Sequence, residues 1–130
     1  MLEKLNISYN FNYNMLIINF VDKNNICLGY DMFQCCCESA DWFISDKEEV
    51  EAFDEDDVNG HEFDVEDYVF DPAYFKYVAC SGLDEGGMVR FRLVNGSNEL
   101  FIHLYNCHNG YYGHGFEFKI GDEIRQEDNL

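Results

Sequence analysis

Acidic side chains crowd the middle of the sequence, between Glu48 and Asp71. Twelve of these 24 residues are Asp or Glu and none is Lys or Arg, so the stretch carries −12 of the formal net charge of −18. Carboxylates at this density repel phosphate and attract Lys and Arg, which disfavours nucleic acid and anionic membranes as direct partners and favours a basic protein. The residues expected to contact that protein are Glu48, Glu49, Glu51, Asp54, Glu55, Asp56, Asp57, Glu62, Asp64, Glu66 and Asp67.

Part of the acidic stretch has the spacing of a calcium-binding loop. Its twelve-residue frame has oxygen-bearing side chains at positions one, three, five and twelve and glycine at position six: Glu55, Asp57, Asn59, Glu66 and Gly60. An EF-hand wraps oxygens around a hard cation in this order. Glu at position one and Glu62 at the normally apolar position eight depart from the pattern. A solvated acidic loop is therefore the favoured interpretation, and we expect neither a bound metal nor a cofactor.

A second group combines thiols and imidazoles: Cys35, Cys36, Cys37, Cys107, His108 and His114. Zinc sites usually contain spaced pairs such as C-x2-C, whereas adjacent residues on a strand point to opposite faces. A thiol nucleophile, Cys36 or Cys37 activated by His114, needs basic neighbours to lower its pKa, and the charge of this chain is acidic. Buried free thiols are favoured and no enzymatic activity is expected, with a Cys/His-dependent enzyme as an alternative.

The segment 105–116 is rich in aromatic, amide and glycine residues. Its three glycines allow close backbone approach, and exposed Tyr is common at protein interfaces. Tyr111 and Tyr112 therefore have two interpretations of equal weight. They contact the partner, or they cap the core at the end of a tight hairpin.

Alternating hydrophobicity predicts strands before the acidic stretch. In residues 5–13 the apolar side chains of Leu5, Ile7, Tyr9, Phe11 and Tyr13 alternate with polar ones, which is typical of a half-buried strand. Strands at 15–21 and 26–30 follow, joined by a turn at 22–25, and complete an antiparallel meander. The end of segment 34–44 also has strand character.

The second half of the chain predicts another meander. Strands are expected at 74–80, 88–94, 99–107 and 111–120, and Asn-Gly pairs at 95–96 and 109–110 favour hairpin turns between the last three. Residues 63–70 are compatible with strand or helix. Ser45 and Glu48 have the spacing of a capping box, which predicts a short helix over 46–53. Residues 122–130 are expected to be a frayed polar tail.

Length and composition predict one domain. A chain of 130 residues, 47% hydrophobic and 17% aromatic, can bury a core without disulfides or metal. We expect a mainly β (α+β) fold: a single antiparallel β-meander or sandwich-like domain over 1–121, with one short inserted helix. The sequence has no secretory signal and no membrane span, so its six Cys are expected to be free thiols in a cytoplasmic protein.

Two motifs resemble a small family of phage and bacterial β-rich domains of unknown function. One is Cys36-Cys37-Glu38 followed by a strand, and the other is Asn109-Gly110-Tyr111-Tyr112 in a hairpin. A third Cys and the extended acidic insert depart from the family pattern. The resemblance implies a phage or mobile-element setting and suggests that the two motifs lie together in the fold, but it implies no activity.

The leading functional hypothesis is a non-enzymatic inhibitor that blocks the nucleic-acid groove of a basic partner, in the manner of an anti-CRISPR or other anti-defence protein. Carboxylates would take the place of phosphates opposite Arg and Lys. An immunity protein for a nuclease toxin has the same chemistry. A calcium-binding module is a further alternative, and the oligomeric state stays open.

Overall fold

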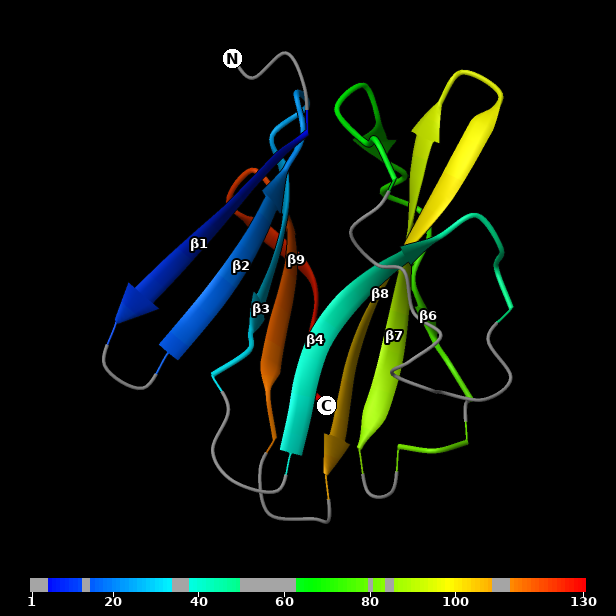
Figure 1. Cartoon of the computed structure of the whole chain (residues 1–130). Coiled ribbons are helices and arrows are strands. Elements are labelled where there is room, and N and C mark those ends of the chain that lie inside the picture. Colours follow the sequence, from blue (N-terminus) through cyan, green and yellow to red (C-terminus); the bar gives the residue numbers. More distant parts are fainter. Residues whose placement is uncertain are drawn as a thin grey trace.

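The computed structural model describes residues 5–12, 15–33, 38–49, 63–79, 81–83, 86–108 and 113–130. Within these ranges the chain forms ten β-strands and no helix, and so no helix that is long and apolar enough to cross a membrane. The strands make two antiparallel sheets (Figure 1), and the prediction of a mainly β fold is confirmed.

The first sheet joins the two ends of the chain. Its strands, in spatial order, are β1 (Asn6–Asn12), β2 (Met15–Val21), β3 (Ile26–Asp31), β9 (Gly115–Ile120) and β10 (Glu123–Asn129). The first three follow one another as the alternating pattern predicts, and the expected N-terminal meander is confirmed. β9 then pairs with β3, so the middle of the sheet is made by segments from opposite ends of the sequence.

The second sheet contains the middle of the chain. Its strands, in spatial order, are β4 (Glu38–Ser45), β8 (Asn98–His108), β7 (Gly87–Asn95) and β5 (Val69–Phe70), and β6 (Lys76–Tyr77) also pairs with β7. The strand expected over 74–80 is therefore reduced to the two residues of β6. Residues 63–70, compatible with strand or helix by sequence, are irregular until β5.

The β7–β8 hairpin is built as its Asn-Gly pair predicts. Asn95 pairs with Asn98 across a two-residue loop, and Gly96 has a φ of +61°, which side chains with a Cβ rarely adopt. Two-residue loops that begin with such a glycine match the twist of paired strands.

The second predicted hairpin, between β8 and β9, is wrong, because these strands lie in different sheets. Both edges of β8 are already occupied, by β4 and β7. β9 instead lies between β3 and β10, where Phe116 and Phe118 enter the core. The Asn109-Gly110 pair itself lies outside the described residues.

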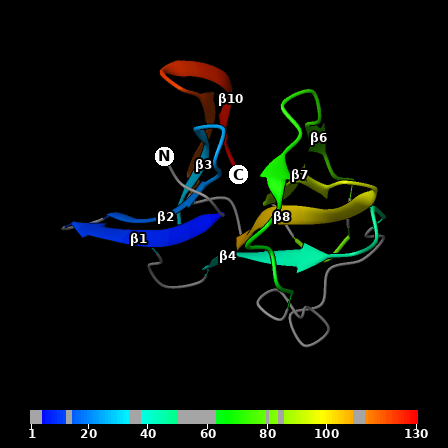
Figure 2. The same ribbon diagram turned by 90° about the horizontal axis from the view of Figure 1, so that it is seen from above.

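One hydrophobic core is shared by the two sheets, which makes the domain a sandwich (Figure 2). Phe91 of β7 and Phe118 of β9 meet across it with ring centroids 4.8 Å apart. The buried Tyr30 hydroxyl of β3 donates a hydrogen bond to the Tyr105 carbonyl of β8 at 2.8 Å. A pair of aromatic rings such as Phe91 and Phe118 contributes about 0.5–1.5 kcal/mol beyond its buried area. The aromatic composition of the chain is therefore used mainly to hold the sheets together.

The predicted helix over 46–53 is wrong: its first four residues are irregular, and the other four lie outside the described residues. The Ser45 hydroxyl donates to the Lys47 carbonyl at 3.0 Å and accepts from the Lys47 N–H at 2.9 Å. Local side-chain bonds of this kind compete with helix formation. The Glu48 carboxylate, expected to cap the helix, binds the Lys76 ammonium instead.

The frayed tail expected at 122–130 is also wrong, because most of it is strand β10, hydrogen-bonded to β9. All seven β10 side chains are exposed, so their composition resembles that of a tail. The end of the segment is anchored: Leu130 is buried, and its carbonyl accepts hydrogen bonds from the Asn106 side chain at 2.9 Å and the His114 N–H at 3.1 Å.

Candidate functional site

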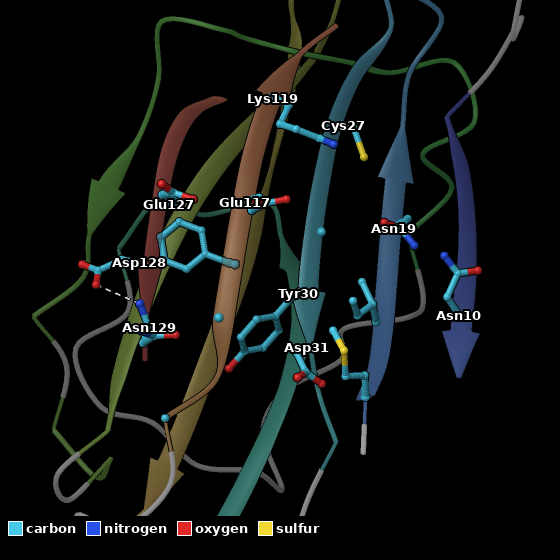
Figure 3. Close-up of a pocket in the computed structure, with 16 residues that line it drawn as sticks. Asn10, Asn19, Cys27, Tyr30, Asp31, Glu117, Lys119, Glu127, Asp128 and Asn129 are labelled. Carbon is cyan, nitrogen blue, oxygen red and sulfur yellow. Dashed lines mark hydrogen bonds between the residues drawn. The ribbon is translucent and has the colours of Figure 1, made fainter. Parts of the chain in front are cut away.

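The outer face of the first sheet carries a hollow of about 840 Å³ (Figure 3). Side chains from all five strands of the sheet line it, so the hollow depends on the pairing of β3 with β9. Its polar lining comprises three amides, four carboxylates and one ammonium: Asn10, Asn19, Asn129, Asp31, Glu117, Glu127, Asp128 and Lys119. The hollow is therefore acidic and rich in hydrogen-bonding groups.

Two glycines in the middle strands keep the hollow open. Neither Gly29 of β3 nor Gly115 of β9 has a positive φ, so the backbone does not require glycine at either position. A Cβ at Gly29 would lie 3.3 Å from the Asn19 Oδ1, and one at Gly115 would lie 3.1 Å from the Asn129 Oδ1. Glycine weakens a strand and often marks a place where another group approaches the backbone.

Two like charges face each other across this surface. Glu117 of β9 is directly opposite Glu127 of β10 in the register, and both side chains are exposed. Among the described residues, neither carboxylate has a hydrogen-bond donor or an ion-pair partner. Like charges directly opposite each other destabilise a sheet by about 0.2–1 kcal/mol. A cation placed between the two would remove that penalty.

Cys27 lies in the same hollow, opposite Lys119 in the register. Burial raises the pKa of the Cys27 thiol and outweighs the lowering effect of the Lys119 ammonium, while the Glu117 and Asp22 carboxylates raise it further. The thiol is therefore protonated at neutral pH, the opposite of what a nucleophile requires.

Five of the acidic residues predicted to contact a partner lie in the described part of the chain: Glu48, Glu49, Asp64, Glu66 and Asp67. All but Glu48 are exposed. The others, and the two tyrosines, lie outside the described residues: Glu51, Asp54, Glu55, Asp56, Asp57, Glu62, Tyr111 and Tyr112. Their contact with a partner stays a prediction.

Glu48 is engaged within the chain. Its carboxylate accepts hydrogen bonds from the Lys76 ammonium at 2.6 Å and the Tyr74 hydroxyl at 3.0 Å. These bonds, the one from Lys76 above all, hold the pKa of Glu48 below its usual range. The Tyr74 ring in turn lies 5.3 Å from Lys76 Nζ and 5.1 Å from the Arg92 guanidinium, which binds Asp71. This cluster pairs two carboxylates of the acidic stretch, Glu48 and Asp71, with Lys76 of β6 and Arg92 of β7.

Of the four oxygen ligands of the predicted calcium loop, Glu66 lies within the described residues. Its N–H donates a hydrogen bond to the Asp64 carboxylate at 3.1 Å. Glu55, Asp57 and Asn59 lie outside them. In the part of the chain that is described, no three His, Cys, Asp or Glu side chains are grouped as metal ligands. Calcium binding by the loop therefore stays an alternative hypothesis, beside the favoured interpretation of a solvated acidic loop.

The thiol and imidazole candidates are only partly described. His114 is buried, and its Nδ1 lies 2.7 Å from the Asp31 carbonyl, to which it donates as the Nδ1–H tautomer. The Cys107 thiol faces the Gly82 carbonyl at 3.5 Å. The described residues do not include Cys35, Cys36, Cys37 or the side chain of His108. Activation of Cys36 or Cys37 by His114 therefore stays an untested alternative.

Of the two family motifs, Glu38 alone lies within the described residues, in the second sheet. Glu38, the last residue of the Cys-Cys-Glu motif, is opposite His108, which immediately precedes Asn109. The rest of both motifs lies outside the described residues.

Sequence alone does not predict the hollow. The outward alternation of Glu117 and Lys119 can be read from the sequence, and so can a mid-strand glycine at Gly29. The pairing of β3 with β9 brings Gly29, Glu117 and Lys119 onto one face of the sheet. No local pattern in the sequence predicts that pairing.

Comparisons of the chain with protein-family models, with curated proteins and with solved structures gave no match.

Proposed function

We propose that the protein is a non-enzymatic interaction protein of the inhibitor class, whose carboxylate surface binds the nucleic-acid groove of a basic protein. The supporting observation is the imbalance of exposed charge. Four of the seven described Lys and Arg residues lie within 4.0 Å of a carboxylate of their own chain: Lys76, Arg92, Arg125 and the buried Arg90. Exposed acids such as Glu49, Asp64 and Asp67 have no such cation among the described residues.

The physics of such an inhibitor is electrostatic. Carboxylates on a folded scaffold substitute for phosphates opposite the Arg and Lys of the partner and attract it over long range. Salt screens this attraction beyond about 8–10 Å, so binding weakens as salt rises. No chemical step is needed, because occupancy of the groove is enough to exclude nucleic acid.

The hollow on the first sheet forms a concave part of the surface that binds the basic partner. An Arg or Lys side chain of the partner enters between Glu117 and Glu127, and the surrounding amides hydrogen-bond the partner's backbone. The open floor at Gly29 lets that backbone approach the sheet. An anti-defence inhibitor and an immunity protein share this chemistry, and the identity of the captured partner distinguishes them.

Affinity capture from host lysate tests the proposal. The immobilised wild-type chain should retain a basic nucleic-acid-binding protein at low salt and release it at high salt. The triple variant Glu55→Gln, Asp56→Asn, Asp57→Asn should lose at least tenfold in affinity, or about 1.4 kcal/mol. A triple variant of equal charge, Glu99→Gln, Asp122→Asn, Glu123→Gln, is the control and should retain the partner. Capture that ignores both salt and the first variant would refute the proposal.

The contribution of the hollow has its own test. Glu117→Gln with Glu127→Gln should weaken capture about tenfold or more while leaving the melting temperature equal or higher, because a repulsive cross-strand pair is removed. Gly29→Leu should weaken capture by filling the hollow, and Gly29→Ala, which leaves most of it open, should do so much less. Full capture by both the double variant and Gly29→Leu would show that the hollow takes no part.

A further inference from the structure

β1 is an edge strand whose outer side is unprotected. It is first in the order of its sheet, so its outward N–H and C=O groups have no partner strand among the described residues. In both views no described strand lies beyond it (Figures 1 and 2). Its pairing with β2 is regular over seven residues, without a bulge. A long, regular edge of this kind is a template for another strand.

The opposite edge of the same sheet is protected. β10 has a register shift between Ile124 and Gln126, and four of its seven residues are charged in the sequence EIRQEDN. Bulges and charged side chains are the usual means of blocking edge-to-edge pairing. The sequence of β1, NISYNFN, contains neither. The chain therefore blocks one edge of this sheet and leaves the other open.

Burial fades along β1 toward its open end. Leu5, just before the strand, is 4% exposed and Ile7 is half-buried, but Tyr9 is 54% and Phe11 is 70% exposed. All four were expected to share one half-buried face, and that face extends past the core. The Phe11 ring lies beside that of Phe33, with the two ring centroids 6.3 Å apart. Exposed aromatic side chains beside an open edge mark an interaction surface.

This surface is also free of charge. About one residue in four of the chain is charged, yet residues 5–21 contain no Asp, Glu, Lys or Arg. The other long uncharged segment, 100–116, includes β8, where pairing on both edges and burial account for the absence of charge. Exposed β1 has no such explanation. Because a second copy also carries −18, an uncharged edge is where two copies can approach with the least repulsion.

We propose that two copies of the chain pair through β1 in antiparallel register about a twofold axis at Tyr9. In this register Tyr9 faces Tyr9 of the second copy, Ile7 faces Phe11, and Ser8 faces Asn10. Apolar residues then meet apolar residues on one face and uncharged polar residues meet on the other, so the strand is complementary to itself. The two five-stranded sheets become one continuous sheet. The proposal does not depend on the proposed function, and the two surfaces share one β1 residue, Asn10, which also lines the hollow.

The dimer and the inhibitor complex respond to salt in opposite directions. Repulsion between two acidic copies opposes pairing, and salt screens that repulsion, so the dimer tightens as salt rises. Binding to a basic partner weakens under the same change. Failure of one proposal is thus distinguishable from failure of the other.

Sedimentation velocity of the full chain, from about 1 µM to about 1 mM, tests the pairing. We expect a monomer–dimer equilibrium whose dissociation constant falls at least about threefold between low and high salt. Tyr9→Glu and Tyr9→Lys each place two like charges opposite each other and should weaken the dimer at least about tenfold. Ile124→Glu, at an exposed apolar position on β10, is the control and should leave dimerisation unchanged within about twofold.

A cross-link tests the register. Tyr9→Cys places two thiols directly opposite each other, within the Cα separation of about 4.4–6.8 Å that a disulfide spans, and mild oxidation with diamide should give a covalent dimer. Asn6→Cys, distant from its counterpart in this register, should give no more dimer than the wild type. A chain that stays monomeric at every concentration and salt, or a dimer indifferent to both Tyr9 substitutions, would overturn the proposal.

Discussion

Asp22→Ala should reduce the free energy of unfolding by about 3 kcal/mol or more. The Asp22 side chain is 1% exposed and lies in the turn between β2 and β3. Its Oδ1 accepts from the N–H groups of Asn24 and Ile26, both at 2.9 Å, and its Oδ2 accepts from the Phe70 N–H at 2.8 Å. Removing the carboxylate leaves three backbone donors without their partner, and each buried orphan costs about 1–3 kcal/mol.

The loss should affect both sheets, because Phe70 belongs to β5 of the second sheet while Asp22 follows β2 of the first. Denaturant unfolding monitored by the single Trp42 measures the effect. Asp46→Ala, at an exposed irregular position, is the matched control and should change stability by no more than about 0.5 kcal/mol. A loss below about 1 kcal/mol for Asp22→Ala would mean that the turn does not depend on the carboxylate.

The stability of the fold should fall by about 2 kcal/mol between pH 7 and pH 5 because of His103 alone. Its ring is fully buried and stacked on Phe43 at 4.4 Å, and its Nε2 accepts from the Arg90 Nε at 3.1 Å. Burial, and then the positive charge of Arg90, lowers the pKa of His103 to about 3. Arg90 contacts the ring through Nε, while its Nη1 lies 3.9 Å from the Glu48 carboxylate and donates to the Tyr74 hydroxyl at 3.4 Å.

The sign follows from proton binding. Below its ordinary pKa of about 6.5 the imidazole is protonated in the unfolded chain but stays neutral in the folded one. The unfolded state therefore gains stability as the pH falls from about 6.5 toward 3. The carboxylates with lowered pKa, such as Asp71 and Glu48, add a further loss only below their ordinary values near 4.

His103→Gln tests this assignment, because a glutamine oxygen can accept from Arg90 and does not titrate. Between pH 7 and pH 5 the free energy of unfolding of the variant should fall by about 2 kcal/mol less than that of the wild type. An NMR titration of the wild-type imidazole is the second measurement, and the ring should remain neutral at pH 5. Protonation of His103 near pH 6.5 would contradict the account whatever the variant does.

Local patterns predicted the elements that are built locally. The alternation from Leu5 to Phe11 and the polar turn at 22–25 predicted the N-terminal meander, and Asn95-Gly96 predicted the β7–β8 hairpin. Each depends on residues that are neighbours in sequence. The same reasoning failed for the Ser45 capping pattern, since a hydroxyl at that position can close a turn onto Lys47 as readily as it begins a helix.

Partner choice between distant strands could not be predicted. By its sequence pattern β9 could pair with β8 through a hairpin or with β3 across the sheet, because the alternation of Phe116 and Phe118 with polar residues is compatible with both. β9 pairs with β3 because both edges of β8 are already paired, one with β4 and the other with β7. That occupancy is a property of the whole fold. The hollow follows from that choice, because Gly29 and Glu117 become neighbours only in this sheet.

Displacement of nucleic acid is the most direct test of the central claim, that the acidic surface occupies a nucleic-acid groove. The basic protein captured from lysate is loaded with a fluorescent oligonucleotide, and the wild-type chain is titrated in at low salt. We predict displacement that is complete near one equivalent of inhibitor once both are well above the dissociation constant, and at least tenfold more variant is needed for Glu55→Gln, Asp56→Asn, Asp57→Asn. If the chain binds the captured protein while the oligonucleotide stays bound, the acidic surface does not act as a nucleic-acid mimic.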